Sequence, residues 1–295
     1  GTETAELAVK IVRKYWYDKG TPRTTILTFE GAFHGRSTAA IAAAGSEKMT
    51  KGFGPLMPGF KQLPWGDMAA FEAAMDDTIA AVMIEPIQGE GGIRPLPEDC
   101  LRGIRAACDR TGALLVLDEV QCGMGRTGKL FAHEWAGITP DIMMVAKGIG
   151  GGFPLGAVLA TENAASGMVA GTHGSTYGGN PLGCAVGLAV TQIVSDPAFL
   201  ADVSRKAGLL RQRLEGLIAA HPDTFESVRG VGLMLGIKCK APNTDLAAAA
   251  RDAGVLVVPA ADNVLRLLPA LNIPDADILE SVARLDSAAT ALESR

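Results

Sequence analysis

Short apolar runs alternate with longer segments of helical periodicity through the first two thirds of the chain. The apolar runs lie at residues 24–29, 80–84, 113–117, 141–146 and 156–160. Nearly continuous apolar runs of this length are typical of strands that are covered on both faces, as in a parallel sheet. The pattern therefore predicts an α/β fold class with a mostly parallel central sheet.

Helical periodicity is clearest from Thr4 to Tyr17, where apolar residues recur on one face. The same reasoning predicts further helices at 67–76, 97–111 and 181–194, the last of them beginning at a proline.

The pattern changes after Ser195. One long amphipathic segment, 198–220, is followed by short apolar strands and by a final helix from about Asp275. This is an α+β pattern, which predicts a second and smaller domain. We therefore divide the chain into a large domain, 1–195, and a C-terminal small domain, 196–295.

Composition allows a large core and excludes several classes of protein. The chain has 295 residues, of which 48% are hydrophobic and 20% are charged, so general disorder is not expected. The net charge of −5 includes no basic block, which argues against a nucleic-acid partner. No apolar run has the length of a membrane span, which is about 20 residues. The five cysteines lack metal-ligand spacing, so we predict reduced thiols, no metal and a cytoplasmic location.

The segment 123–129 (GMGRTGK) partly fits two nucleotide-binding patterns. Leu130 stands where a phosphate-binding loop has a serine or threonine for magnesium. In the dinucleotide pattern, the glycines directly follow a strand and open a helix, whereas here DEVQC intervenes and Pro140 follows soon after. The segment is therefore weak evidence for a nucleotide site.

Charged residues follow two of the predicted strands. Asp118 and Glu119 close the run 113–117, and Lys147 closes the run 141–146 within IMMVAKGIGGGFPLG. The two carboxylates have an ordinary alternative role, which is to cap the next turn. Ligands of open α/β sheets, however, bind at the carboxyl ends of the strands.

An aspartate at one strand end and a lysine at another, with glycines after the lysine, suit the binding of pyridoxal phosphate. That cofactor forms a Schiff base with a lysine and pairs its ring nitrogen with an aspartate. A nucleophilic lysine also needs a partly desolvated site or a nearby cation to lower its pKa. The glycines after Lys147 are expected to leave room for the cofactor.

Two segments are candidates for the cofactor's phosphate. Gly1 and Thr2 begin the first predicted helix, where free N–H groups and the helix dipole favour an anion. Ser175 and Thr176 supply hydroxyls in a glycine-rich segment. The alternatives are a plain helix N-cap for Thr2 and an ordinary turn for the second segment.

Five motifs, in this order, resemble the class III aminotransferases, a fold-type I family that depends on pyridoxal phosphate. They are FHGRS (33–37), IEPIQGEGG (84–92), LDEVQCGMGRTG (117–128), AKGIGGGFPLGA (146–157) and HGSTYGGNPLGCA (173–185). The opening residues resemble the family's phosphate-loop helix, so we expect the family's N-terminal segment to be missing from this sequence.

The resemblance implies roles for individual residues. Lys147 would bind the cofactor covalently and move a proton, and Asp118 would keep its ring nitrogen protonated. Phe33 would stack on the ring and Gln121 would contact its phenolic oxygen. The implied cofactor-binding set is Gly1, Thr2, Phe33, Asp118, Glu119, Val120, Gln121, Lys147 and Thr176. Thr176 would come from the neighbouring subunit of a homodimer with shared active sites.

Four residues are implied in substrate binding. Arg36 would bind a substrate carboxylate, although a surface position is its ordinary alternative, and Ser175 would face the substrate. Arg266 lies among apolar residues in VLRLL and resembles a second carboxylate-binding arginine. Glu90, between glycines that give it room to move, would pair with Arg266 when the substrate offers no carboxylate. Its alternative role is to cap a turn.

The motifs are most similar to those of family members that move the terminal amine of N2-acetyl-L-ornithine to 2-oxoglutarate in arginine biosynthesis. Other amine donors remain open, namely ornithine, succinylornithine and 4-aminobutyrate. An aminomutase and an inactive remnant that pairs with an intact subunit also remain open. The histidines lack metal-ligand spacing, and we predict no catalytic role for them; they are His34, His133, His173 and His221.

Overall fold

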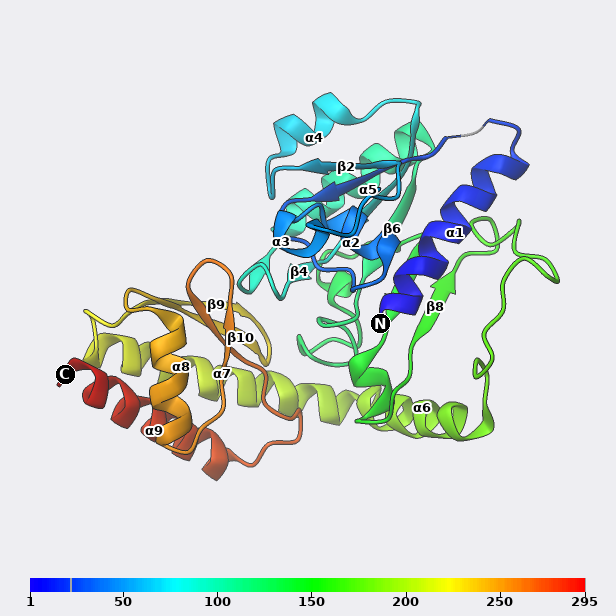
Figure 1. Cartoon of the computed structure of the whole chain (residues 1–295). Coiled ribbons are helices and arrows are strands. Elements are labelled where there is room, and N and C mark those ends of the chain that lie inside the picture. Colours follow the sequence, from blue (N-terminus) through cyan, green and yellow to red (C-terminus); the bar gives the residue numbers. More distant parts are fainter. Residues whose placement is uncertain (22, 295) are drawn as a thin grey trace. The chain divides into compact units, whose positions relative to one another are not determined.

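The structure is a computed structural model that describes residues 1–21 and 23–294, which divide into two units (Figure 1). The first unit contains Gly1–Pro86, Leu96–Met124 and Phe131–Ile193. The second contains Ile87–Pro95, Gly125–Leu130 and the chain from Val194 onward. The sequence placed both of these short segments in the large domain, because neither contains an element long enough to produce a pattern.

A mostly parallel sheet forms the centre of the first unit, in the order β2-β1-β3-β6-β7-β8. β8 alone among these strands runs antiparallel to its neighbour, β7. The α/β class with a mostly parallel sheet is therefore confirmed. The strands are β1 (Thr25–Phe29), β2 (Phe60–Leu63), β3 (Ile79–Ile84), β6 (Leu114–Asp118), β7 (Ile142–Val145) and β8 (Ala157–Ala160).

Helices cover both faces of this sheet, which explains the continuous apolar runs. Alternate residues of a strand point to opposite faces. Met83 packs toward α1 (Thr2–Asp18), whereas Ile84 packs toward α4 (Met68–Ala74) and α5 (Glu98–Thr111). Trp16 of α1 also donates an Nε1–H hydrogen bond of 2.8 Å to the carbonyl of Ala80.

The sequence did not reveal α2 (Thr38–Ala44), α3 (Glu47–Thr50) or β2. The sequence of α2 is TAAIAAA, and six of its seven residues are buried, so it has no polar face that would mark a helical period. β2 has the sequence FKQL and lies at the edge of the sheet. Its four residues alternate too weakly between apolar and polar to predict a strand.

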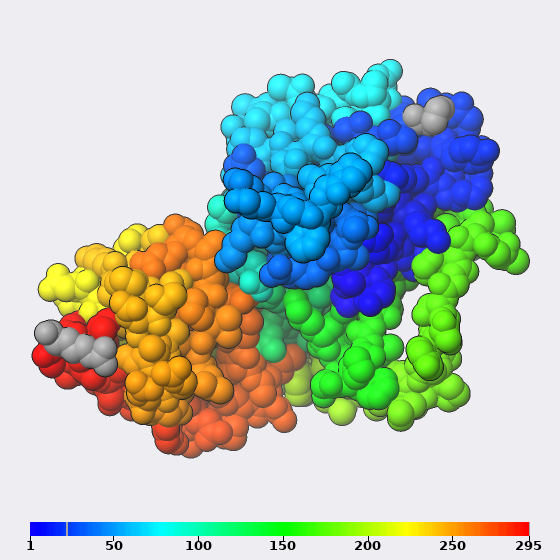
Figure 2. Space-filling model, viewed as in Figure 1, coloured from blue at the N-terminus to red at the C-terminus, as the bar shows by residue number. Residues whose placement is uncertain are grey.

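The helix α6 (Pro181–Val194) is almost entirely apolar yet largely exposed. Leu182, Leu188 and Ile193 are 62%, 61% and 59% exposed. The segment that precedes α6, green in Figure 2, extends away from the rest of the first unit as a single stretch of backbone without a neighbouring stretch beside it. Exposed apolar surface of this extent is typical of an interaction surface.

The second unit has an antiparallel sheet in the order β11-β12-β10-β9. Its helices contribute most of a separate apolar core, built around Leu214, Leu235 and Leu285. The hairpin β4–β5 also belongs to this unit. The elements are β4 (Ile87–Gln88), β5 (Arg94–Pro95), α7 (Pro197–Ala220), β9 (Phe225–Val231), β10 (Met234–Cys239), α8 (Asn243–Asp252), β11 (Val258–Ala260), β12 (Val264–Leu267) and α9 (Asp275–Glu293).

Across the described residues, no helix taken singly has both the length and the apolar composition to cross a bilayer. The consecutive helices α6 and α7 meet that test only as a sharply bent pair.

Candidate active site

The carboxyl ends of four neighbouring strands supply the polar residues of one cavity. Glu85 directly follows β3, Asp118 is the last residue of β6, and Lys147 lies two residues after β7. The segment that follows β1 contributes Phe33 and His34. Because these strands are parallel neighbours, the residues meet at the same edge of the sheet, as the sequence predicted for Asp118 and Lys147.

This cavity has a volume of about 120 Å³. Most of the residues predicted to bind a cofactor line it, whereas Glu119 and Thr176 do not. The lining residues are Gly1, Thr2, Phe33, His34, Gly35, Glu85, Asp118, Val120, Gln121 and Lys147.

Asp118 is held by one donor on each carboxylate oxygen. Its side chain is 4% exposed; Oδ2 lies 2.8 Å from His34 Nδ1, and Oδ1 accepts the N–H of Val120 at 3.0 Å. An ionised carboxylate has about four acceptor positions, so both oxygens retain capacity for another donor. Asp118 therefore fits the protonated ring nitrogen of a bound pyridine.

His34 and Glu85 belong to this site, although the sequence did not reveal them. The side chain of His34 is fully buried, and Glu85 Oε1 accepts the N–H of Phe33 at 2.9 Å. In the sequence, the indication that these two residues belong to a site is that His34 lies in the motif FHGRS and Glu85 lies in the motif IEPIQGEGG. Their meeting with Asp118 depends on the strand order, which the sequence pattern does not specify.

Lys147 has a strained backbone and an exposed side chain. Its φ of 47° lies in the left-handed region, which costs a non-glycine residue about 1–3 kcal/mol and is found mainly at functional sites. Lys147 is exposed in the single chain, at the start of the short helix η2 (Lys147–Gly150), and the expected partly desolvated site or nearby cation stays a prediction.

Two of the glycines around Lys147 make room for protein atoms. A Cβ at Gly148 would lie 2.9 Å from the Cβ of Met124, and one at Gly156 would lie 3.0 Å from Cγ2 of Thr4. These glycines let the turn after β7 pack closely, so their presence does not by itself indicate a ligand.

The N-terminus of α1 opens into the same cavity through Gly1 and Thr2. Gly1 is the N-cap, so the alternative N-cap role of Thr2 is not observed. Thr2 Oγ1 instead accepts the N–H groups of Arg36 (3.2 Å) and Ser37 (3.0 Å). A Cβ at Gly35 would lie 2.4 Å from this hydroxyl, so only glycine allows the approach. The first turn of a helix that faces a cavity is a common place for an anion to bind.

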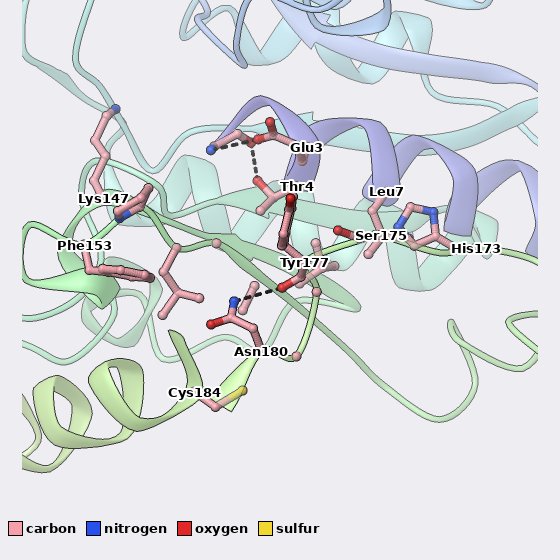
Figure 3. Close-up of a pocket in the computed structure, with 18 of the residues that line it drawn as sticks. Glu3, Thr4, Leu7, Lys147, Phe153, His173, Ser175, Tyr177, Asn180 and Cys184 are labelled. Carbon is pink, nitrogen blue, oxygen red and sulfur yellow. Dashed lines mark hydrogen bonds and ion pairs between the residues drawn. The ribbon is translucent and has the colours of Figure 1, made fainter. Parts of the chain in front are cut away.

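A larger cavity, of about 960 Å³, also includes Lys147 among its lining residues. Glu3, Thr4 and Leu7 approach it from α1, and Tyr177 and Asn180 approach it from the segment before α6 (Figure 3). Ser175 and Thr176 are both exposed; Ser175 lines this cavity and Thr176 does not.

Glu119 has a structural environment that differs from its predicted one. Its fully buried carboxylate accepts the N–H groups of Ala132 (2.9 Å) and His133 (2.8 Å) and lies 3.0 Å from His133 Nδ1. Successive residues at a strand end point in opposite directions, so Glu119 faces away from the side where Asp118 lies. It anchors the turn that begins the short helix η1 (Ala132–Trp135).

The two arginines predicted to bind substrate lie in different units. Arg36 is exposed, and its guanidinium lies 5.4 Å from the centre of the Phe33 ring. Arg266 of β12 is 7% exposed, and its Nη1 lies 2.6 Å from Glu90 Oε1. The backbone carbonyl of Glu90 accepts the N–H of Ala261 at 3.1 Å. The movement expected from the flanking glycines stays a prediction.

The segment GMGRTGK forms turns and does not open a helix. Gly128, with φ of +90°, packs against Ser204, so its glycine has a packing reason within the second unit. No cluster of three His, Cys, Asp or Glu side chains suited to a metal ion occurs among residues 1–21 and 23–294.

Comparison with known proteins gives consistent matches over the whole chain. The family described as Aminotransferase class-III matches residues 1–289. An acetylornithine aminotransferase of Rhodobacter capsulatus is 71% identical over 296 residues, which cover 100% of this chain and 75% of that relative. A solved ornithine aminotransferase of Toxoplasma gondii has a TM-score of 0.94 at 30% sequence identity. The matched region covers 100% of this chain and 72% of the Toxoplasma gondii chain. A solved N-acetylornithine aminotransferase of Stenotrophomonas maltophilia has a TM-score of 0.84 at 37% identity, over 99% and 73% of the two chains.

Proposed function

The chain belongs to the class III aminotransferases, and from that membership we propose that it transfers the terminal amine of N2-acetyl-L-ornithine to 2-oxoglutarate. Enzymes of this family use pyridoxal phosphate and act on amino acids and oxo acids. The observation that carries the proposal is the meeting of Lys147, Asp118 and the α1 N-terminus in one cavity. The relative at 71% identity supports arginine biosynthesis as the setting.

The cavity offers a partner for each part of the cofactor. When bound, pyridoxal phosphate supplies an aldehyde that reacts reversibly with amines and a ring that withdraws electrons from the reacting carbon. Lys147 offers the amine, Asp118 offers a buried carboxylate with remaining acceptor capacity, and the first turn of α1 offers N–H groups for the phosphate. The residues present therefore fit this cofactor.

We assign the chemical roles as follows. Lys147 Nζ would hold the aldehyde of the bound cofactor and would carry the proton of the reaction. Asp118 would hold the proton on the ring nitrogen through a charge-assisted hydrogen bond. Phe33, Val120 and Gln121 line the same cavity and would hold the ring, and Gly1 and Thr2 would hold the phosphate.

Arg36 and Ser175 are proposed to bind the substrate. A guanidinium binds a carboxylate through two parallel hydrogen bonds, which a lysine does not provide. The exposure of Arg36 leaves its guanidinium accessible, and Ser175 lines the larger cavity beside Lys147.

Glu90 is proposed to be the internal partner of Arg266 when acetylornithine is bound. Glutamate carries a carboxylate beside its reacting amine, whereas acetylornithine carries none there. Arg266 is 7% exposed and its 2.6 Å contact with Glu90 compensates a cation that is costly to bury alone. Glu90 is 40% exposed, so its side chain has room to move aside for glutamate.

Glu90→Ala is expected to lower kcat/KM of the acetylornithine half-reaction by about tenfold or more, because Arg266 loses this carboxylate. The glutamate half-reaction should be unchanged or faster. Single-turnover measurements with each donor give the ratio, and Glu90→Gln separates the charge from the hydrogen bond. An equal loss for both donors would leave Glu90 as a residue of the β4–β5 turn.

A homodimer is part of the proposal, with a second copy of the chain covering α6. Leu182, Leu188 and Ile193 of α6 are exposed and apolar, and Tyr177, in the segment before this helix, is 81% exposed. Thr176 lies in this exposed segment and lines neither of the two cavities that contain Lys147. A position at the interface agrees with its predicted contact with the phosphate of the neighbouring subunit.

Leu188→Glu is expected to raise the dimer dissociation constant by about tenfold or more, since it places a charge in an apolar interface. Sedimentation velocity over a concentration series measures this change. Leu256→Glu is the matched control, because Leu256 is also exposed (84%) but lies in the second unit. If Leu188→Glu, Leu256→Glu and the unaltered protein all have the same dimer dissociation constant, the assignment of α6 to the interface is contradicted.

The amine donor distinguishes this function from its nearest competitor. Ornithine remains a second candidate because of the TM-score of 0.94 to the Toxoplasma gondii enzyme. At the α-carbon, ornithine carries a charged ammonium group, whereas acetylornithine carries a neutral amide. A site that fits the neutral amide therefore binds the charged ammonium group less well. We expect kcat/KM for acetylornithine to exceed that for ornithine by at least about tenfold. A preference for ornithine, succinylornithine or 4-aminobutyrate in the same assay would replace the proposed donor.

The cytoplasmic location predicted from the sequence remains part of the proposal. All five cysteines are free thiols, as is usual in a reducing compartment.

A further inference from the structure

The hydroxyl of Thr2 contacts the segment that carries Arg36. Thr2 is the first residue of α1, whereas Arg36 lies between β1 and α2. Thr2 Oγ1 accepts the N–H of Arg36 at 3.2 Å and the N–H of Ser37 at 3.0 Å, and it lies 2.7 Å from Ser37 Oγ. All three contacts join the start of α1 to the segment 33–37.

These contacts use the full hydrogen-bonding capacity of the Thr2 hydroxyl. A hydroxyl has two lone pairs and one proton. The N–H groups of Arg36 and Ser37 occupy the two lone pairs, so the proton of Thr2 is donated to Ser37 Oγ. The backbone N–H of Thr2 is therefore the part of this residue that is left for a phosphate.

The segment 33–37 depends on side chains for its position, because residues 32–37 form neither a helix nor a strand. Glu85 Oε1 accepts the N–H of Phe33 at 2.9 Å and holds one end of the segment. Thr2 holds the other end. Gly35 lies between these two contacts with a φ of +126°, and a Cβ at this position would lie 2.4 Å from Thr2 Oγ1. The segment is thus packed directly against the Thr2 hydroxyl.

The position of the Arg36 guanidinium follows from the position of this backbone. Arg36 is exposed, and its guanidinium lies 5.4 Å from the centre of the Phe33 ring. Phe33 and Thr2 both line the cavity of about 120 Å³. A shift of the backbone at Arg36 would therefore move the guanidinium relative to this cavity. A misplacement of about 1 Å is enough to cause a large loss of productive binding.

We propose that the Thr2 hydroxyl is a positioning group for Arg36, and that it determines how well the site binds the carboxylate of acetylornithine. The inference rests on the proposed role of Arg36. It leaves the phosphate of the cofactor to the backbone N–H groups at the start of α1. Loss of the hydroxyl should therefore weaken substrate binding and leave cofactor binding unchanged.

Three quantities test this division of roles. The first is the pair of kcat and KM values for acetylornithine. The second is the Kd of N2-acetyl-L-norvaline, which has the same acetamido and carboxylate groups but no reacting amine, measured by calorimetry on the enzyme loaded with cofactor. The third is the Kd of pyridoxal phosphate. A group that only positions the substrate changes KM and the Kd of the analogue, whereas a phosphate ligand changes the Kd of the cofactor.

Thr2→Val keeps the branched shape of the side chain and removes the hydroxyl. We expect KM for acetylornithine and the Kd of the analogue to rise about tenfold, while kcat and the Kd of pyridoxal phosphate stay within about twofold. Thr2→Ser retains the hydroxyl and should restore all four values. The matched control is Thr38→Val, because Thr38 is exposed, follows Ser37 directly and is not a partner of Thr2. It should leave KM unchanged.

A double variant shows whether Thr2 acts through Arg36. Arg36→Gln removes the guanidinium and should raise KM for acetylornithine at least as much as Thr2→Val does. In the Arg36→Gln background, Thr2→Val should raise KM no further, because the group that it positions is already missing. An additional tenfold rise in the double variant would show that Thr2 acts by another route and would overturn the inference.

The remaining outcomes are distinguishable. A tenfold rise in the Kd of pyridoxal phosphate in Thr2→Val assigns the hydroxyl to the phosphate and overturns the inference. An unchanged KM in Thr2→Val also overturns it, while a raised KM in Arg36→Gln leaves the role of Arg36 intact. An unchanged KM in Arg36→Gln contradicts the proposed role of Arg36 and the inference with it. If circular dichroism shows that Thr2→Val does not fold, Thr2→Ala takes its place and the same values decide.

Discussion

Lys147→Ala is expected to lower the transamination rate by at least about 10⁴-fold, because the variant loses both the covalent attachment and the proton carrier. Lys147 lines both the cavity of about 120 Å³ and the cavity of about 960 Å³, and it is the lysine that these two share. The fold should be retained, since the side chain is exposed and alanine at φ 47° bears a backbone cost similar to that of lysine. Steady-state kinetics, with circular dichroism for folding, measures the effect.

Two controls make this result specific to Lys147. Lys61→Ala removes another exposed lysine, in β2, and should leave kcat unchanged. Methylamine added to Lys147→Ala should restore part of the rate, because a free amine can carry the proton. Turnover in Lys147→Ala within tenfold of the unaltered enzyme would contradict the assignment.

Asp118→Asn is expected to lower kcat by about 10³-fold, which corresponds to about 4 kcal/mol of transition-state stabilisation. The amide is nearly isosteric and can still accept the N–H of Val120, so the strand end should keep its geometry. A neutral amide, however, cannot hold a proton on the ring nitrogen as a carboxylate does. Steady-state kinetics at saturating cofactor measures the loss.

Glu119→Gln is the matched control for Asp118→Asn. Glu119 is the neighbouring buried carboxylate, but it binds the N–H groups of Ala132 and His133 and does not line the cavity. The control should therefore lower the melting temperature while changing kcat only a few-fold. Equal kinetic losses in the two variants would indicate that Asp118 acts through structure alone.

The sequence predicted Asp118 and Lys147 because each of them directly follows or ends an apolar run that is recognisable as a strand. Once β6 and β7 are accepted as parallel neighbours, Asp118 and Lys147 must meet at their carboxyl ends. The apolar runs were readable because helices cover both faces of the sheet. The same runs placed five of the six strands of the central sheet within one or two residues of their observed bounds.

The sequence could not reveal features that depend on tertiary contacts. His34 meets Asp118 across β3, and an imidazole without metal-ligand spacing gives no pattern that predicts such a contact. Glu119 was grouped with Asp118 because the two are adjacent, although the strand turns them to opposite sides. The exposure of Lys147 follows from the turn after β7, whose glycines were read as space for a ligand.

The attachment of the cofactor to Lys147 is the central claim, and borohydride reduction followed by peptide mapping tests it most directly. Borohydride converts a carbon–nitrogen double bond between cofactor and protein into a stable single bond. The account predicts that the pyridoxyl group will be found on the peptide that contains Lys147, and that Lys147→Ala will carry none. A pyridoxyl group on a different lysine of the unaltered protein would contradict it.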